Sequence, residues 1–485
     1  MYDLIIKNVF VVQPGNEGSF HADIAISNGK IEAITPFIPA DQARQLYDGN
    51  GQLAFPGLVD AHMHTGIYNP LAEDALTESR AAASGGVTSS LNYMRTGKYY
   101  LNKTGSYANF YPEVLDISSN RFYVDYTYHI APIQYSHIEE IELLLEKWGV
   151  TSFKIFMFYG NYGLHGNSAA QKDFLMTPEG EFYDYAHFEF IMRGVTRVME
   201  KYPEKADSIS LGLHCETAEI MRAYTRLVQE EGKLTGLRAY SAARPPHSEG
   251  LAIFIASYLA NETACKNINL LHLSSAKAVD AAMMMQHVFP HINFKREVTL
   301  AHLILDYDCA CGVHAKVNPP IRCREDVEYL WKHLLAGNID WVCSDHACCK
   351  AEIKTDLADK KNVWLAKSGF GGTELLLSGL YTEGIRRGLS VNRIAELLSS
   401  NPAKRFGLHS KGQLSEKYDG DVVLFDPKQI FTVDSKDSES TQGYSVFEGH
   451  TFQGKVTATF LRGQLIFENG KVLGEPKGNY LHRPY

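Results

Sequence analysis

The stretch LAFPGLVDAHMH, residues 53–64, contains the clearest indication of the fold. An apolar run with the composition of a buried strand leads into two histidines that are separated by one residue. Because residues i and i+2 of a strand face the same side, His62 and His64 can reach one metal ion together. A single His-x-His pair is a weak signal, and its meaning depends on what the other strands carry.

Short apolar runs recur along the middle of the chain, with helical patterns between them. Continuous apolar character is typical of parallel strands that are buried on both faces. The runs span residues 152–158, 209–215, 268–274 and 339–344. The helical patterns span residues 139–148, 325–336 and 391–399, and the third is expected to stop at Asn401-Pro402. Strand and helix alternate over about 350 residues, which predicts a (β/α)₈ TIM barrel of the α/β class.

Several of these apolar runs carry one polar residue near the end, where a barrel has its active site. Taken singly, Lys154 is more often a snorkelling or ion-paired lysine, and His214 and His272 are more often satisfied core residues. An aspartate such as Asp345 is rarely left unpaired at the end of a buried strand. Together with the His-x-His pair, they predict a site for Zn²⁺ or a similar divalent ion. The other histidines are interpreted as structural, including His302 and His346.

Lys154 has a second interpretation, because it lies inside the very apolar run FKIFM. Burial disfavours the charged ammonium, so its pKa should fall. A neutral amine can capture CO₂ as a carbamate, whose two oxygens can bridge two metals.

Both chain ends are rich in short alternating strands. Residues 4–12, 23–33, 420–426 and 455–473 show the pattern, and Asn28-Gly29 and Asn469-Gly470 indicate tight hairpin turns. We expect the two ends to form one small β-sandwich beside the barrel. The expected boundaries are residues 1–55 for its first part, 56–411 for the barrel, and 412–485 for its second part and the tail.

Composition excludes several classes of protein. The 485 residues are 45% hydrophobic and carry a net charge of −9, which argues against disorder and against nucleic acid or an anionic membrane as partner. No apolar run approaches the roughly 18 residues of a membrane helix. The first residues lack a signal-peptide pattern, so we expect a cytoplasmic protein. The eight cysteines, all at or after Cys215, are expected to be buried, reduced thiols.

With these motifs in view, the chain resembles the amidohydrolase superfamily, in the branch of cyclic amidases that contains dihydropyrimidinases, hydantoinases and allantoinases. The resemblance covers essentially the whole chain, including the sequences at both ends. The matching segments are PGLVDAHMH (56–64), SFKIFM (152–157), HCE (214–216), HLSS (272–275) and SDH (344–346).

The resemblance implies a binuclear site, with Zn²⁺ as the expected metal. His62, His64 and Asp345 would hold the more buried ion, and His214 and His272 the more exposed one. Carboxylated Lys154 and a hydroxide would bridge the two ions. The hydroxide would attack the ring amide, while Asp345 would act first as general base and then as general acid.

The resemblance also implies three substrate contacts. Tyr159 would help to hold the oxyanion, although an aromatic residue can simply pack at a strand end. The backbone of Asn318, in Asn-Pro-Pro-Ile-Arg, would bind the ring amide, although this motif is also a rigid turn. Near position 368 the family usually has an asparagine, and this chain has Ser368. The resemblance implies that the backbone at this position contacts the substrate, so the change of side chain need not abolish binding.

Two further departures bear on the substrate. Dihydroorotases carry an arginine two residues after the second histidine to bind a carboxylate, and this chain has Gly66 there. Residues 88–100, TSSLNYMRTGKYY, match neither hydantoinases nor allantoinases well. Arg95 and Lys98 could line the mouth of the site, but we expect a solvated loop.

The leading hypothesis is a metal-dependent hydrolase of a cyclic ureide or imide, such as a dihydropyrimidine or a 5-substituted hydantoin. Allantoinase is the alternative, and dihydroorotase is disfavoured. A non-catalytic scaffold relative is disfavoured because all six expected ligands are present, and a purely structural zinc protein because such sites prefer closed Cys/His tetrahedra. The expected partner is a small cyclic amide, and the resemblance implies a homo-oligomer, either a tetramer or a dimer.

Overall fold

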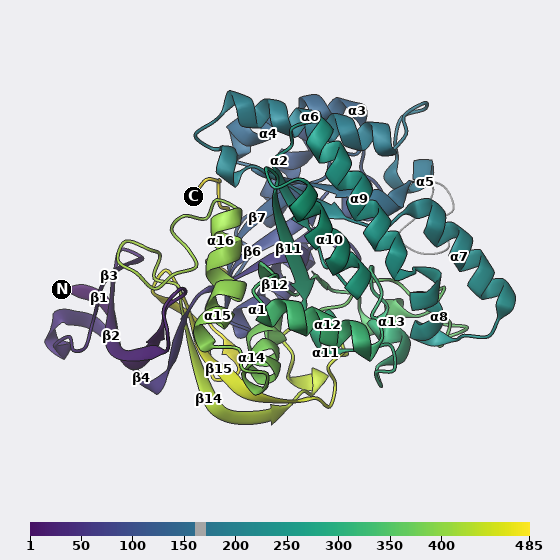
Figure 1. Cartoon of the computed structure of the whole chain (residues 1–485). Coiled ribbons are helices and arrows are strands. Elements are labelled where there is room, and N and C mark those ends of the chain that lie inside the picture. Colours follow the sequence, from purple (N-terminus) through teal and green to yellow (C-terminus); the bar gives the residue numbers. More distant parts are fainter. Residues whose placement is uncertain (161–170) are drawn as a thin grey trace.

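Nine short strands pair in a single parallel sheet in the computed structural model, which describes residues 1–160 and 171–485 (Figure 1). The strands are hydrogen-bonded in the order β12-β11-β10-β9-β8-β7-β6-β5-β13. Their bounds are β5 Leu58–His64, β6 Val87–Met94, β7 Asp125–Ile130, β8 Ser152–Phe156, β9 Ser210–His214, β10 Asn267–Leu270, β11 Asn293–Thr299, β12 Trp341–Cys343 and β13 His346–Ala347.

The two ends of this sheet meet and close the barrel. β12 pairs with β11, while β13 pairs with β5, and both ladders are parallel. Only Ser344 and Asp345 separate β12 from β13, so these two segments form one interrupted barrel strand. The sheet is therefore an eight-stranded barrel whose last strand is broken at Asp345, which confirms the predicted fold class.

Helices follow the barrel strands and cover the outside of the barrel (Figure 1). They are α1 Leu71–Ser84, α2 Tyr107–Ser118, α3 Tyr135–Glu139, α4 Ile141–Trp148, α5 Gln171–Leu175, α6 Tyr185–Lys201, α7 Ala218–Glu231, α8 Gly236–Ala243, α9 Pro246–Glu262, α10 Ala276–Val288, α11 Leu300–Ile304, α12 Arg324–Leu335, α13 Ala351–Lys354, α14 Leu376–Arg386, α15 Val391–Ala395 and α16 Asn401–Arg405. As the sequence predicts, α4 ends before Gly149, which has the left-handed conformation of a helix cap.

The expected stop at Asn401-Pro402 is wrong. α15 continues through a π-helical turn at Glu396–Ser400 into α16. Pro402 is the second residue of α16 and follows the π-helical turn directly, where the Asn401 N–H bonds to the Glu396 carbonyl five residues earlier. A proline at this position is compatible with a continuing helix, and the sequence pattern alone did not show that a wider turn precedes it.

The two chain ends form a second, mixed sheet of eight strands in the order β17-β16-β15-β14-β4-β1-β2-β3. Side chains from strands of both ends share one apolar core. Both expected hairpin turns are present, with positive φ angles at Asn28, Gly29, Asn469 and Gly470. The strands are β1 Tyr2–Val12, β2 Ser19–Ser27, β3 Lys30–Thr35, β4 Ala43–Pro56, β14 Val422–Thr432, β15 Thr451–Leu461, β16 Gln464–Glu468 and β17 Lys471–Val472.

The last residues of the chain leave this sheet and return to the barrel. Tyr480 bridges to Tyr126 of β7, and the side chain of Arg483 is completely buried. All eight cysteines are free; five are buried, and Cys309, Cys311 and Cys323 are half-buried. Among the described residues, every helix is too short or too polar to cross a bilayer.

Candidate metal centre

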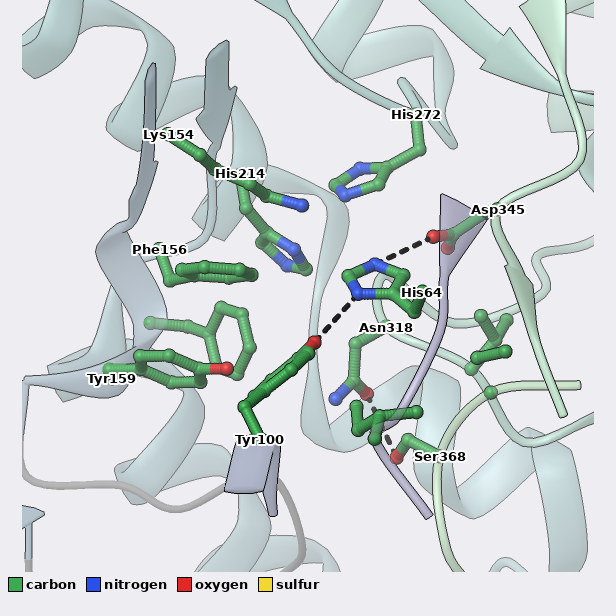
Figure 2. A pocket seen from close by; sticks show the side chains of 15 residues that line it. His64, Tyr100, Lys154, Phe156, Tyr159, His214, His272, Asn318, Asp345 and Ser368 are labelled. Carbon is green, nitrogen blue, oxygen red and sulfur yellow. Dashed lines mark hydrogen bonds and ion pairs between the residues drawn. The ribbon is translucent and has the colours of Figure 1, made fainter. Parts of the chain in front are cut away.

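The polar residues predicted at the strand ends converge on one pocket. Because the barrel strands are parallel, their carboxyl ends lie at the same edge, and this edge carries the pocket (Figure 2). Five of the six expected ligands line it: His64, Lys154, His214, His272 and Asp345. The sixth, His62, is fully buried and contacts four of these five.

His62, His64 and Asp345 form the tightest group. Oδ1 of Asp345 lies 3.1 Å from Nε2 of His62 and 3.3 Å from Nε2 of His64. Nδ1 of His62 is 2.7 Å from a Glu297 oxygen and donates its proton there, which leaves the Nε2 lone pair directed into the group. Burial alone would raise the pKa of Asp345, but the two imidazoles hold it below its usual range. The carboxylate therefore stays ionised beside two nitrogen lone pairs.

Lys154 reaches the same place from β8. Its Nζ is 3.1 Å from Nε2 of His62 and 3.7 Å from the centre of the Tyr93 ring. Burial lowers the pKa of Lys154 below its usual range, which favours the neutral amine.

His214 and His272 form the other side of the site, with ring centres 4.3 Å apart. Nε2 of His214 is 2.7 Å from a Glu216 oxygen, and Nε of Arg244 donates a hydrogen bond to the other oxygen of Glu216. Nδ1 of His214 is therefore the nitrogen left to bind a ligand. Nδ1 of His272 is buried without a hydrogen-bond partner among the described residues.

Two of the expected ligands adopt left-handed backbone conformations. His272 has φ of 35° and Asp345 has φ of 53°, and each lies two residues beyond the end of its strand. Such conformations cost free energy for residues other than glycine and are often found at functional sites. At both positions the backbone leaves the strand direction just where the side chain enters the pocket.

The donor set fits divalent ions. Imidazole nitrogens and a carboxylate oxygen are suitable ligands for Zn²⁺ and similar metals, and the ligand atoms of His62, His64 and Asp345 lie within 4.8 Å of one another. Burial lowers the pKa of both His62 and His272, which keeps these imidazoles neutral. The unpartnered Nδ1 of His272 gives independent support, because a buried polar atom is seldom left unsatisfied.

The expected substrate contacts also surround the pocket. Tyr159 ends a short helical turn after β8, is 1% exposed, and stacks on Phe156 with ring centres 4.6 Å apart. Tyr100 lies beside Tyr159, and its hydroxyl is 2.8 Å from Nδ1 of His64 (Figure 2). In Figure 2 the hydroxyl of Tyr159 points into the pocket, and Asp345 lies on the opposite side.

Asn318 and Ser368 face each other at the pocket wall. Oδ1 of Asn318 accepts hydrogen bonds from the hydroxyls of Tyr240 (2.5 Å) and Ser368 (3.4 Å). Its Nδ2 is buried and has no hydrogen-bond partner among the described residues. The carbonyl of Ser368 accepts from the Tyr68 hydroxyl. The side-chain amide of Asn318 therefore offers a free donor that the expectation of a backbone contact did not include.

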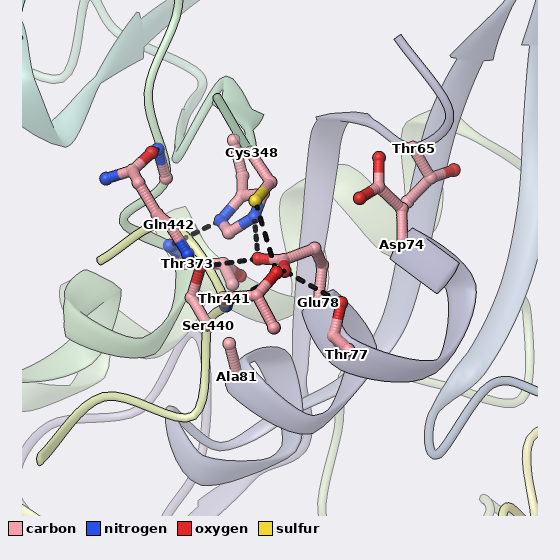
Figure 3. A network of polar contacts seen from close by, with 12 residues as sticks. Thr65, Asp74, Thr77, Glu78, Ala81, Cys348, Thr373, Ser440, Thr441 and Gln442 are labelled. Atoms are coloured by element: carbon pink, nitrogen blue, oxygen red, sulfur yellow. Dashed lines mark hydrogen bonds and ion pairs between the residues drawn. The ribbon is translucent and has the colours of Figure 1, made fainter. Parts of the chain in front are cut away.

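His302 and His346, which the sequence suggested were structural, hold loops around the site. Nε2 of His302 is 3.1 Å from the Pro319 carbonyl, beside Asn318. His346 lies between Glu78 of α1, at 2.8 Å, and the backbone N–H of Gly372. Glu78 also accepts hydrogen bonds from Ser440 and Thr441 (Figure 3).

The expected solvated loop at residues 88–100 is wrong. Residues 87–94 are the barrel strand β6, and each of them is buried. Arg95 follows directly and is 1% exposed, whereas Lys98 points to solvent. The segment has the polar composition of a loop. In a barrel, however, a strand can carry small polar side chains that pack inside the protein, as β6 does.

Sequence reasoning missed several residues that contact the site, most clearly Glu297 of β11. Its two oxygens accept from Nδ1 of His62, the backbone N–H of His272 and Nε1 of Trp341. Burial raises the pKa of Glu297 above its usual range. A carboxylate near the end of a strand was the available signal, but residues 293–299 were not among the expected strands.

Comparison with known proteins identifies the family. The model of the amidohydrolase family matches residues 255–466. An allantoinase from Rubrobacter xylanophilus is 31% identical over 491 residues, which cover 99% of this chain and 97% of that enzyme. An L-hydantoinase (dihydropyrimidinase) structure from Arthrobacter aurescens superimposes with a TM-score of 0.84 at 26% identity, covering 99% of both chains. A dihydropyrimidinase structure from Brevibacillus agri has the same fold, with a TM-score of 0.84 at 24% identity over 100% of this chain and 99% of that one.

Full-length similarity to these enzymes agrees with the broken eight-stranded barrel and with its cluster of imidazoles. The chain belongs to the amidohydrolase superfamily, in its branch of cyclic amidases.

Proposed function

We propose that this protein hydrolyses the ring amide of a cyclic ureide or imide, such as a dihydropyrimidine or a 5-substituted hydantoin, with two bound divalent ions. The observation that carries the proposal is the convergence of six side chains from five parts of the barrel on one pocket. They are His62, His64, Lys154, His214, His272 and Asp345.

The contacts support a division of these residues between two ions. His62, His64 and Asp345 would hold one ion, preferably Zn²⁺, and His214 and His272 the other, with a carboxylated Lys154 shared between them. When bound, two such cations acidify a water molecule between them and polarise a carbonyl oxygen. The lowered pKa of Lys154 supports carboxylation, because only the neutral amine reacts with CO₂.

The remaining groups have distinct proposed tasks. Asp345 accepts the proton of the attacking water and passes it to the leaving ring nitrogen, since its carboxylate remains ionised in the free site. The hydroxyl of Tyr159 donates to the carbonyl oxygen as negative charge develops on it. Nδ2 of Asn318 donates to a second carbonyl of the ring, because Tyr240 and Ser368 already occupy its Oδ1.

Uncharged rings fit this site better than a ring with a carboxylate. The backbone N–H of Gly66 donates to Asp74, and a Cβ at this position would lie 3.0 Å from Cβ of Leu71. Residue 66 is therefore shaped by the fold and offers no cation to a substrate. A ring carboxylate buried without a partner would cost binding free energy.

Allantoin is the second candidate substrate, favoured by the allantoinase that is 31% identical over nearly the whole chain. The test is a ring-opening assay with dihydrouracil, dihydrothymine, hydantoins, allantoin, succinimide and dihydroorotate. We expect dihydrouracil or a hydantoin to be opened at least about ten times more efficiently than dihydroorotate, a difference of about 1.4 kcal/mol. Dihydroorotate as the best substrate would contradict the argument from Gly66, and allantoin as the best substrate would select the second candidate.

A further inference from the structure

Arg95 is a buried cation for which the proposed chemistry has so far given no task. It follows the last residue of β6, at the end of the barrel that carries the pocket, and it is 1% exposed. Nη1 donates to the Thr96 carbonyl at 2.8 Å. Nε and Nη2 have no hydrogen-bond partner, and no carboxylate lies within ion-pair distance of Arg95, among residues 1–160 and 171–485. Since arginine does not lose its proton in proteins, this positive charge is permanent.

Aromatic rings take the place of a carboxylate around this guanidinium. Its central carbon lies 4.6 Å from the ring centre of Phe174, 4.9 Å from that of Tyr100 and 5.2 Å from that of Tyr159. Tyr100 and Tyr159 line the pocket, whereas Arg95 does not. The charge therefore lies one ring behind the pocket wall and acts on the pocket through these two tyrosines.

Of the two tyrosines, Tyr159 is the one whose hydroxyl is not hydrogen-bonded to an expected metal ligand. The hydroxyl of Tyr100 is already hydrogen-bonded to His64. Burial raises the pKa of Tyr159, and the charge of Arg95 works in the opposite direction. A phenol beside a fixed cation is a stronger hydrogen-bond donor, and the gain is largest when the acceptor becomes an anion.

We propose that Arg95 is a positioning residue for Tyr159: its guanidinium, held between three aromatic rings, orients the phenol and strengthens its hydrogen bond to the oxyanion. This inference rests on the proposed function and adds to it a residue that never touches the substrate. It follows that Arg95 contributes to kcat through Tyr159 and contributes little to ground-state binding of the substrate.

The experiment is a double-mutant cycle on the metal-loaded enzyme with Arg95→Met, Tyr159→Phe and the double variant. We expect Arg95→Met to lower kcat about tenfold with KM changed less than about twofold. In the Tyr159→Phe background the same substitution should change kcat less than about twofold, because the hydroxyl through which it acts is gone. Arg95→Lys keeps the charge and should recover a large part of the lost kcat.

Lys98→Gln is the matched control, because it removes a positive charge from the same segment at a solvent-exposed position. Metal content is measured in every variant, since Tyr100 also connects Arg95 to His64. Equal losses of kcat on Arg95→Met with tyrosine and with phenylalanine at position 159 would overturn the proposal. So would a loss seen mainly as a raised KM for carboxylated rings, which would make Arg95 a binding group for the substrate.

A second readout needs no turnover and separates this inference from the proposed function. The wild type, Arg95→Met, Tyr159→Phe and the double variant are unfolded with urea. The shift of the urea midpoint caused by Arg95→Met is then compared between the proteins with tyrosine and with phenylalanine at position 159. A smaller shift with Tyr159→Phe supports a direct contact between the guanidinium and the phenol, even if none of the rings in the assay is opened. Identical shifts would show that the guanidinium does not interact with the phenol hydroxyl, even in an active hydrolase.

Discussion

Lys154 holds its amine in a buried part of the site, where a charged lysine is poorly accommodated. Its Nζ contacts an imidazole nitrogen of His62 and two aromatic rings, and no carboxylate oxygen lies within ion-pair distance among the described residues. Such surroundings favour a neutral amine. A carbamate on this amine would supply the negatively charged oxygens that no neighbouring carboxylate provides.

The first prediction is that Lys154→Ala loses both metal and activity. The wild-type chain prepared with CO₂ should contain about two divalent ions, and the variant less than about one, because the shared ligand is gone. Metal content is measured by mass spectrometry, and added acetate or propionate should restore part of the activity. The exposed Lys201 provides the control Lys201→Ala. Full metal occupancy and full rate in Lys154→Ala would contradict the carbamate.

The second prediction concerns Asp345, whose role differs from that of an ordinary ligand. Asp345→Asn keeps an oxygen for the metal but cannot accept a proton, so kcat should fall roughly 10²-fold or more. Metal content is determined in the same samples, and Asp340→Asn, at the other end of β12, is the control. A rate near that of the wild type with both ions bound would disprove the proton-transfer role.

At the scale of the element, helix α1 is joined to the broken barrel strand by a single buried carboxylate. Glu78 accepts hydrogen bonds from Thr77, Ser440, Thr441 and His346, and the last of these directly follows Asp345. Burial would raise the pKa of Glu78, but the contacts with His346 and the hydroxyls lower it to about 2. The charged form of Glu78 therefore fixes both the helix and the strand break.

The third prediction is a pH dependence of stability due to Glu78. Its folded pKa of about 2 lies below the usual value of 4.5, so the stabilisation is complete above pH 4.5 and is lost as the pH falls towards 2. The difference corresponds to about 3 kcal/mol. Urea unfolding at pH 7, 4.5 and 3 should show that Glu78→Gln is less stable at pH 7 and less sensitive to acid than the wild type. The same acid sensitivity in both proteins, with Glu73→Gln as control on the same helix, would contradict the assignment.

How far the sequence could predict each element depended on whether the signal was local. The hairpin turns at Asn28-Gly29 and Asn469-Gly470 and the end of α4 at Gly149 are fixed by backbone conformations that few residues adopt, so the sequence predicted them. β6 and the π-helical turn were missed, because packing against distant segments decides whether a polar strand is buried or a proline is tolerated.

The same distinction holds for the site. The six expected ligands stand out as polar residues on apolar strands, so the pattern indicated all of them. Arg95, Tyr240 and Glu297 matter through contacts with residues far away in the sequence, and no local pattern shows such contacts. Their positions could be found only once the barrel had brought the strands together.

For the whole molecule, the two ends of the barrel have different tasks. The candidate ligands lie at the carboxyl ends of the strands, as in other barrels of this kind. The tail of the chain packs at the opposite end, where Arg483 donates to Ser152 at the start of β8 and to the carbonyl of Tyr128. The last residue, Tyr485, is tied to the barrel through the carbonyl of Gly407.

The last prediction tests whether this tail serves stability rather than chemistry. The backbone N–H of Gly478 donates to the Phe122 carbonyl, and a Cβ on Gly478 would lie 1.8 Å from the carbonyl oxygen of Val124. Gly478→Ala must therefore displace the tail and uncover Arg483, which should lower the free energy of unfolding by about 3 kcal/mol. Glu475→Ala, at an exposed position in the same tail, should change it by less than about 0.5 kcal/mol. Urea unfolding measures both effects. At a temperature where Gly478→Ala remains folded, its metal content and kcat should equal those of the wild type, because no tail residue is among the described residues that line the pocket. A loss of kcat in the folded variant would show that the tail end of the barrel influences the site, and unchanged stability would show that the tail does not support the barrel.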